Sequence, residues 1–185
     1  VARAKEVNIP ALAALVDAGY DLVAPIPSCV LMFKQELPLM FPDDAQVVKV
    51  QGAMFDPFEY LMLRHRDGKL KTDFKQPLGT VAYHAACHQR VQNIGPRTKE
   101  ILELVPETTV TAIERCSGHD GTYAVKREFH EASMKIVRPV VRQVDALSAE
   151  HYTSDCVMAG HHIRNAMGEH SGELLAPLTL LRKAY

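Results

Sequence analysis

The 185-residue sequence lacks an excess of charge of either sign. Lysines and arginines number 21 and aspartates and glutamates 22, which gives a net charge of −1 with histidine neutral. Proteins that bind nucleic acids usually concentrate positive charge to neutralise phosphates. The charge balance therefore argues against a nucleic-acid partner.

Long apolar runs and a secretory signal are also missing. The longest apolar run, Ala11 to Val16, falls far short of the roughly 20 residues that a membrane-spanning helix needs. The first residues do not follow the order of basic and then apolar residues that marks a secretory signal. We therefore expect a soluble, cytoplasmic protein, at most peripheral to a membrane complex. Because the first residue is Val1 rather than methionine, we also expect an N-terminal portion to precede this chain.

Apolar residues are present in an ordinary share, 47%, beside 23% charged residues, enough for one domain or two small lobes with a sizeable core. Short β-rich runs alternate with stretches of helical spacing, and this predicts an α/β fold with a mainly parallel sheet flanked by helices. Strands are expected at residues 20–24, 79–83, 108–113 and 151–154. Helices are expected at residues 9–18, 30–41, 57–64, 96–105, 123–146 with an interruption near Pro139, and 171–183.

Four cysteines follow the predicted strands: Cys29, Cys87, Cys116 and Cys156. The carboxyl ends of parallel strands lie at one edge of a sheet, and the separations leave room for a helix between successive strands. We therefore expect all four at that edge. Helices that start just after the last three would direct amide groups at the thiolates and favour metal ligation. Four thiolates suit one tetrahedral metal ion or one four-iron cluster.

Other roles for the cysteines fit the pattern less well. A single cysteine near a strand end is most often a small buried apolar residue, and disulfides are disfavoured without a secretory signal. Structural zinc sites usually contain a close CxxC pair, and none occurs here. A nucleophile could be drawn from Cys87 with His88 or from Cys116 with His119, but no third, orienting group is identifiable.

At these loops the chain resembles the cysteine-rich CCG domain. This domain occurs in one component of heterodisulfide reductases, in one component of anaerobic glycerol-3-phosphate dehydrogenases and in the iron–sulfur subunits of lactate and glycolate oxidases. Residues 83–88, YHAACH, are similar to its aromatic-His-x-x-Cys-His loop, and residues 116–122, CSGHDGT, to its Cys-Cys-Gly-x-Gly-Gly-Thr loop. Residues 155–159, DCVMA, resemble a later Cys-Pro-x-Cys or Asp-Cys loop.

The resemblance implies a pseudo-two-fold repeat. Such proteins usually hold two similar repeats, each closed by that last loop, and residues 26–29, IPSC, are similar to the end of a preceding repeat. We therefore expect residues 1–78 to hold the end of an incomplete first repeat with a helical connection. Residues 79–185 would hold the second repeat and a C-terminal helix.

The chain departs from the family pattern at three cysteine positions, where it has Ile26, Ser117 and Ala159. Each of these motifs therefore retains one cysteine. Members with more cysteines per repeat can hold a non-cubane double cluster that cleaves disulfides, and this set of ligands does not favour that chemistry. A [4Fe-4S] cluster needs four thiolates.

The resemblance therefore implies an iron–sulfur site, expected to contain Cys29, Cys87, Cys116 and Cys156. If Cys29 does not reach the other three, His119 or His88 is the nearest candidate for a fourth ligand. Gly118 and Gly121 flank the Cys116 loop, where a backbone with positive φ can approach a cluster or simply form a turn.

The function expected from the resemblance is electron transfer by a [4Fe-4S] domain or subunit of a redox complex. Its partner would be a flavoprotein or a ferredoxin-type protein. One alternative is an iron–sulfur enzyme that acts on a disulfide or a peroxide-like substrate. Another is a metal-free or zinc-stabilised interaction domain.

Overall fold

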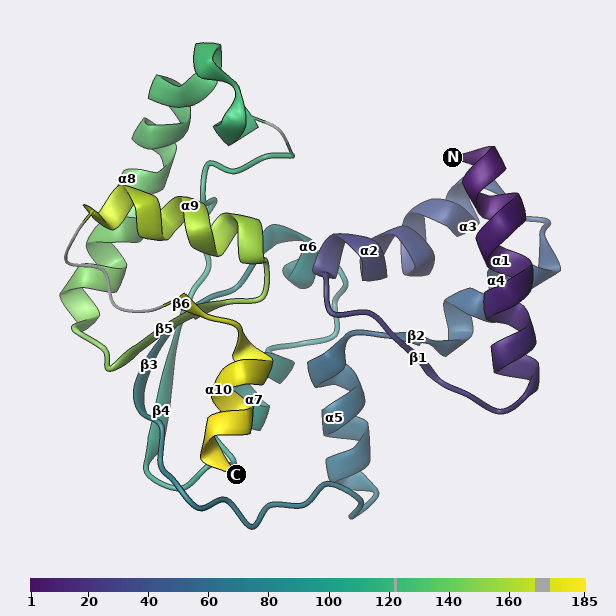
Figure 1. The fold of residues 1–185 in the computed structure, drawn as a ribbon, viewed down its shortest axis with the longest axis horizontal. Coiled ribbons are helices and arrows are strands. Elements are labelled where there is room, and N and C mark those ends of the chain that lie inside the picture. Colours follow the sequence, from purple (N-terminus) through teal and green to yellow (C-terminus); the bar gives the residue numbers. More distant parts are fainter. Residues whose placement is uncertain (122, 169–173) are drawn as a thin grey trace.

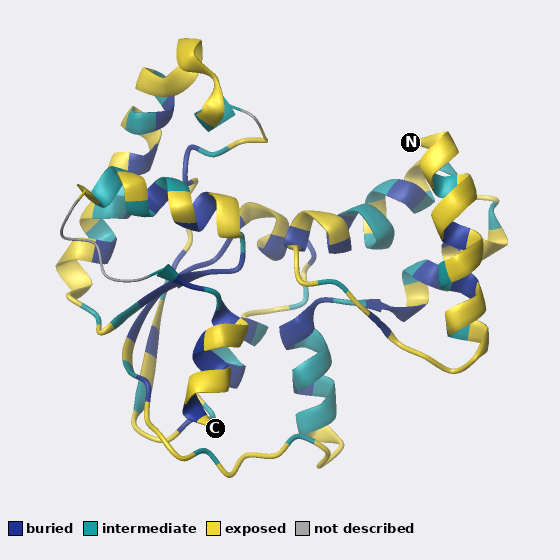
Figure 2. Cartoon of the chain, in the orientation of Figure 1, coloured by how far each residue is buried: buried dark blue, intermediate teal, exposed yellow. Residues whose placement is uncertain are grey.

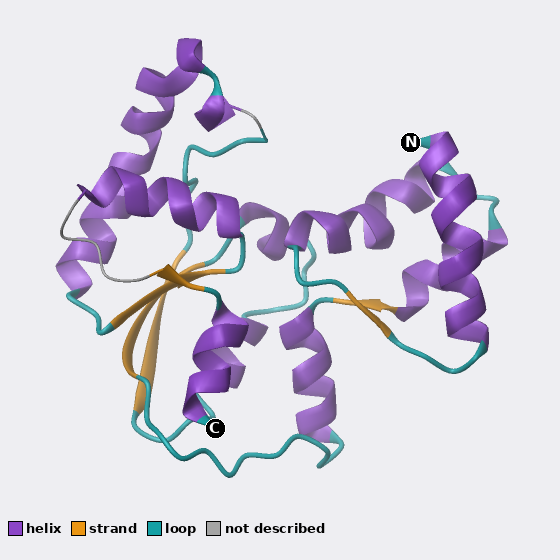
Figure 3. Ribbon diagram, viewed as in Figure 1, coloured by secondary structure: helices purple, strands orange, loops and turns teal. Residues whose placement is uncertain are grey.

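Four parallel strands form the larger sheet of this α/β protein, in the order β4-β3-β5-β6 (Figures 1 and 3). They are β3 (Gly79–His84), β4 (Thr108–Ile113), β5 (His151–Ser154) and β6 (Leu174–Leu175). The computed structural model describes residues 1–121, 123–168 and 174–185. The three longer strands confirm the predicted ranges, whereas β6 was not predicted.

A second, two-stranded parallel sheet lies in the N-terminal part, where β1 (Leu22–Val23) pairs with β2 (Met54–Phe55). Its core contains Ile9, Val30, Val47 and Val50, all almost fully buried. The surrounding helices are α1 (Ala2–Asp17), α2 (Pro27–Leu31), a π-helical turn η1 (Met32–Glu36), α3 (Leu37–Met40) and α4 (Ala45–Ala53).

The predicted start of a helix at residue 30 is wrong, because helix α2 already begins at Pro27. Proline has a fixed φ near the helical value and no N–H to lose, so it is well suited to the first position of a helix. Cys29 is therefore the third residue of a helix rather than part of a loop.

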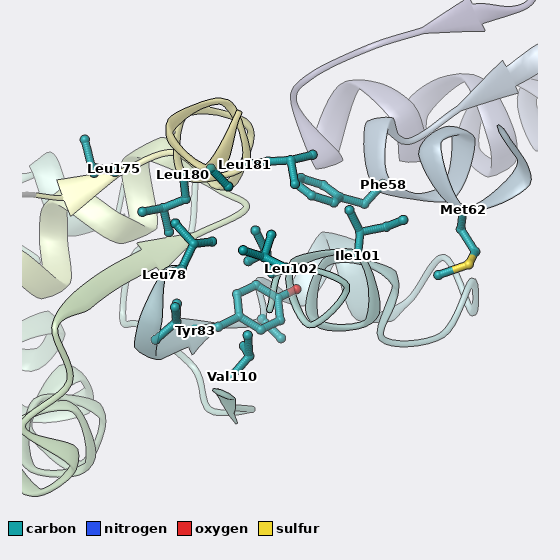
Figure 4. Packing of buried hydrophobic residues seen from close by; sticks show 14 residues of the cluster. Phe58, Met62, Leu78, Tyr83, Ile101, Leu102, Val110, Leu175, Leu180 and Leu181 are labelled. Atoms are coloured by element: carbon teal, nitrogen blue, oxygen red, sulfur yellow. The ribbon is translucent and has the colours of Figure 1, made fainter. Parts of the chain in front are cut away.

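Helices cover both faces of the four-stranded sheet. On one face Val81 and Tyr83 pack against α7 (Arg97–Leu102) and α10 (Pro177–Ala184), with α5 (Pro57–Arg66) alongside (Figure 4). On the other face Ala82 packs against α8 (His130–Leu147) and α9 (Val157–Met167). Neighbouring residues of a strand point to opposite faces, which separates the two cores. Figure 2 shows the buried residues along the sheet and on the inner helix faces.

The helix predicted over residues 123–146 differs from the structure at its start and at Pro139. Two 3-10 turns, η2 (Tyr123–Val125) and η3 (Arg127–Phe129), precede α8, and α8 continues through Pro139. An interior proline costs a helix about 3 kcal/mol. Burial of the valines on this face, about 1.5 to 3 kcal/mol each, outweighs that cost; they are Val137, Val140 and Val144.

The C-terminal helix is shorter than predicted. Residues 171–173 lie outside the described residues, residues 174–175 form β6, and α10 begins with Pro177. Two other helices begin with an aspartate cap. Asp44 accepts hydrogen bonds from the first turn of α4, and Asp56 with Glu59 forms a capping box at α5. Among the described residues, no helix has the length and apolar character that a membrane crossing requires.

Candidate functional site

Three cysteines lie at the carboxyl edge of the four-stranded sheet. Cys87 is the first residue of the short helix α6 (Cys87–Arg90), and Cys156 is the N-cap residue of α9. Cys116 lies in the loop that follows β4. The expectation that a helix starts just after Cys116 is wrong, because the next helical turn, η2, begins at Tyr123.

The order of the strands places two of these cysteines beyond neighbouring strands. Strand β3 lies between β4 and β5; the chain leaves β3 toward β4 through α7 on one face and leaves β5 toward β6 through α9 on the other. In open α/β sheets a crevice forms where the connections diverge in this way, beyond the carboxyl ends of the strands. Cys87 follows β3 and Cys156 follows β5, so both lie at this crevice.

Cys29 belongs to the N-terminal part but is carried toward the same edge. Helix α2, which contains it, packs against α6, which contains Cys87 (Figure 1). A hydrogen bond also joins the two segments, because the side-chain amide of Gln92 donates to the carbonyl of Pro27 at 3.4 Å. All four thiols are free, those of residues 29, 87 and 116 on exposed residues and that of Cys156 on a half-buried one.

The loop after β4 directs an amide at its cysteine. The N–H of Gly118 donates to Cys116 Sγ at 3.4 Å, and Gly118 has a φ of 76°. A Cβ atom at this position would lie 2.6 Å from the carbonyl oxygen of Ser133 in α8. Gly118 is therefore required both by its conformation and by close packing. Gly121, with a φ of 50°, faces open space and fits a plain turn.

The same loop is fixed by a second hydrogen-bonded chain. The fully buried Ser133 hydroxyl donates to the carbonyl of Gly118 at 2.6 Å. His162 Nε2 lies 2.8 Å from the Ser133 oxygen, and since the serine proton is already used, the histidine is the donor. Burial, then the neighbouring His119, lowers the pKa of His162. Helix α9 and the Cys116 loop are thus joined through α8.

His84, at the end of β3, contacts the last residue of β5 and the loop that follows β4. The residue is 1% exposed. Nδ1 lies 2.9 Å from Ser154 Oγ on β5, and Nε2 lies 3.0 Å from the carbonyl oxygen of Arg115 beyond β4. Burial lowers the pKa of His84, which favours a neutral ring.

Asp155 is the buried carboxylate next to Cys156. The hydroxyl of Tyr83 donates to one carboxylate oxygen, and Thr98 Oγ1 donates to the other at 2.8 Å. Burial raises the pKa of Asp155 to about 7, in opposition to both hydrogen bonds. Burial and the charge of Asp155 raise the pKa of Tyr83. These bonds fix the chain just before Cys156 against β3 and α7.

The sequence pattern alone did not assign roles to His84, Ser133 or Asp155. A histidine at the end of an apolar strand and an aspartate just before a cysteine were visible as parts of motifs. Their partners come from elements far apart in the chain, so the pattern held no signal for the contacts. Of the two candidate fourth ligands, His88 is exposed, while the ring of half-buried His119 lies 6.3 Å from that of His162.

The cysteines fit some metal groups better than others. Among the residues that the structure describes, no three His, Cys, Asp or Glu side chains are grouped so that they could hold one metal ion. This arrangement does not fit a mononuclear tetrahedral site such as structural zinc. In a [4Fe-4S] cluster each thiolate bonds a different iron, so the ligands lie farther apart than around one ion. Four free thiols match that cluster in type and number.

The fold and the site define an α/β domain with a cysteine-bearing edge, built from three strand-to-helix connections. Residues 81–164 match the family model described as CCG, cysteine-rich domain. This segment, from β3 into α9, is therefore similar to the CCG cysteine-rich domain family. No curated protein matches the sequence significantly.

Proposed function

We propose that this protein is an iron–sulfur electron-transfer domain, or the corresponding subunit of a redox complex. Cys87, Cys116 and Cys156 would hold a [4Fe-4S] cluster with Cys29 as the fourth ligand. One observation carries the proposal. Three loops of one CCG segment bring free thiols to a single sheet edge, where buried side chains join the loops to one another. This edge would also face a flavoprotein or ferredoxin-type partner.

The contact between α2 and α6 favours Cys29 over His119 as the fourth ligand. It places the helix of Cys29 against the helix that starts with Cys87. His119 instead lies beside His162, on the side of α8 and α9. A ligand from the N-terminal part would also explain why that part packs on the carboxyl edge of the larger sheet.

The residues of this chain would bind and tune the cluster, which supplies one-electron transfer when bound. The Gly118 amide, already directed at Cys116 Sγ, would stabilise negative charge on that thiolate. Hydrogen bonds to cluster sulfurs and exposure to solvent both shift reduction potentials. The buried hydroxyl and imidazole groups would hold the loops in place, and none is required as an acid or base.

Anaerobic purification and reconstitution with iron and sulfide test this proposal. The expected product is coloured, holds about four irons and four sulfides per chain, and gives an electron paramagnetic resonance signal on reduction. Colourless protein without iron after reconstitution would exclude the cluster.

A second candidate is a metal-free or zinc-stabilised interaction domain. Its metal-free form is favoured by the absence, among the described residues, of a group of three side chains arranged for one metal ion. This candidate predicts that the purified protein keeps its fold and binds no iron, with zinc content measured on the same sample. Iron-free protein with unchanged circular dichroism and thermal unfolding would support it.

A further inference from the structure

Buried His84, the last residue of β3, contacts the last residue of β5 and the loop that follows β4. We infer that His84 is a positioning residue that sets the relative places of Cys87, Cys116 and Cys156. Its effect on a cluster rests on the proposed function. Its effect on the loops is a property of the metal-free protein and can be measured there.

The positions along the chain carry the inference. His84 lies three residues before Cys87. Its two hydrogen-bond partners, Ser154 and Arg115, lie two residues before Cys156 and one residue before Cys116. One ring therefore spans the starts of all three loops.

His84 lies where the pairing of β3 with both of its neighbouring strands ends, so its ring can connect the segments that continue beyond the sheet. The β3–β5 pairing ends with His84 opposite Ser154, and the β3–β4 pairing ends with His84 opposite Ile113. Beyond this point the described backbone contacts are sparser, such as the bond from Ala85 N–H to the Ile113 carbonyl. Beyond the end of the sheet, side-chain hydrogen bonds therefore hold the loops at fixed positions relative to one another.

The donors and acceptors assign the protons of the ring. The Arg115 carbonyl can only accept, so Nε2 carries the hydrogen. In a neutral ring Nδ1 is then an acceptor, and the Ser154 hydroxyl donates to it. Both ring nitrogens are satisfied, as a buried histidine requires. Loss of either bond would remove one attachment of one loop and leave the bond to the other loop in place.

Two conservative variants separate the two bonds. In His84→Asn the amide group lies near the place of Nδ1, so the variant keeps the contact with Ser154 and loses that with Arg115. In His84→Gln the amide nitrogen reaches the place of Nε2, so the variant keeps Arg115 and loses the acceptor for Ser154. His151→Gln is the matched control, because it makes the same change on β5 at the opposite end of the sheet.

Hydrogen exchange of the metal-free protein is the first measurement. We expect amides of residues 115–118 to exchange about tenfold faster in His84→Asn, and those of residues 154–157 about tenfold faster in His84→Gln, the scale of one lost buried hydrogen bond. The control should change neither segment. Ser154→Ala removes the same bond from the other side and should reproduce the His84→Gln pattern, even if a His84 variant fails to fold.

Reconstituted protein gives the second measurement. Both His84 variants should shift the midpoint potential and the paramagnetic resonance spectrum, whereas His151→Gln should match the wild type. Equal effects of His84→Asn and His84→Gln on the two segments, or no effect of either, would overturn the inference. A wild type that binds no iron would overturn the proposed function instead, and the exchange pattern would still decide the role of His84.

Discussion

Two regions of the molecule share one local design. In the first, β1 leads into α2 and β2 into α5. In the second, β5 leads into α9 and β6 into α10. Each region has a parallel pair of strands, and each has a cysteine where its first helix begins, Cys29 in α2 and Cys156 before α9. The second helix of each starts with proline, Pro57 or Pro177.

The regions differ in what surrounds the strand pair. The pair β5-β6 continues into β3 and β4, which bring Cys87 and Cys116 to the same edge. The described residues beside β1-β2 form helices α1, α3 and α4. A strand pair with its cysteine is therefore not a site by itself. We propose that residues 1–78 and 79–185 correspond to two repeat units, of which the second supplies three of the four thiols.

The two regions face each other across a small apolar cavity of about 110 Å³. Its lining includes the first residues of four helices: Pro27, Pro57, Val157 and Pro177. Two buried carboxylates also line it, Asp56 from the first region and Asp155 from the second. The carboxyl edges of the two sheets thus meet, and the helix that contains Cys29 lies against the helix that starts with Cys87.

Replacing cysteines by serine should have the largest effect and should distinguish the two regions most clearly. We expect Cys87→Ser, Cys116→Ser and Cys156→Ser each to lose the cluster, because three ligands from one sheet edge define it. Cys29→Ser should retain part of the iron, since its ligand comes from the other region. Iron and sulfide counts after reconstitution measure this, with Val157→Ser as the control beside Cys156. Full iron content in Cys29→Ser would place the fourth ligand elsewhere.

Alanine at two glycines of positive φ tests how closely each region is packed. Gly118→Ala should cost about 2 to 4 kcal/mol of unfolding free energy, from strain and from the contact with the Ser133 carbonyl. Gly19→Ala, at a φ of 89° in open space, should cost about 1 to 2 kcal/mol, from strain alone. Urea unfolding gives both values. Similar costs for the two variants would show that the Cys116 loop can shift to accommodate a Cβ atom at residue 118.

The buried carboxylates predict a pH dependence that both regions share. Burial raises the pKa of Asp56 above its ordinary value, so folding favours its protonated form. The unfolding free energy should therefore fall as pH rises from about 4 through the raised pKa. Asp56→Asn keeps the helix cap, because asparagine caps as well as aspartate, and should flatten this slope.

The slope that survives in Asp56→Asn should be that of Asp155, which has the same sign up to a pKa of about 7. His84 and His162 act oppositely, because their lowered pKa values make stability fall as pH drops below about 6.5. Unfolding free energies at pH 5 and 8 compare the variant with wild type. An unchanged slope in Asp56→Asn would mean that Asp56 does not titrate in this range.

The smallest effects are expected where the regions are most alike. Pro57→Ala and Pro177→Ala should each cost about 0.4 to 1 kcal/mol, because proline at a first helical position restricts the unfolded chain. Thermal unfolding of both variants measures the costs side by side. Clearly unequal costs would show that the two helix starts are not equivalent.

Much of the fold was predictable because many of its helices and strands depend on residues that are close together in the sequence. Strand β4 is a run rich in β-branched residues, and Asp44 and Asp56 stand where helix starts require them. Strands β2 and β6 have two residues each, too short for any alternation of apolar and polar residues to appear. They exist because a neighbouring strand supplies hydrogen bonds.

Local sequence was enough to establish that Cys87, Cys116 and Cys156 follow strands, because strand ends and loops are set by residues close together in the chain. Three-dimensional packing was needed to place Cys29 within a helix against α6 and to let His84 join three loops. Those contacts depend on strand order and on which edges of the two sheets meet. Both follow from the burial of apolar faces over the whole chain, which no local pattern records.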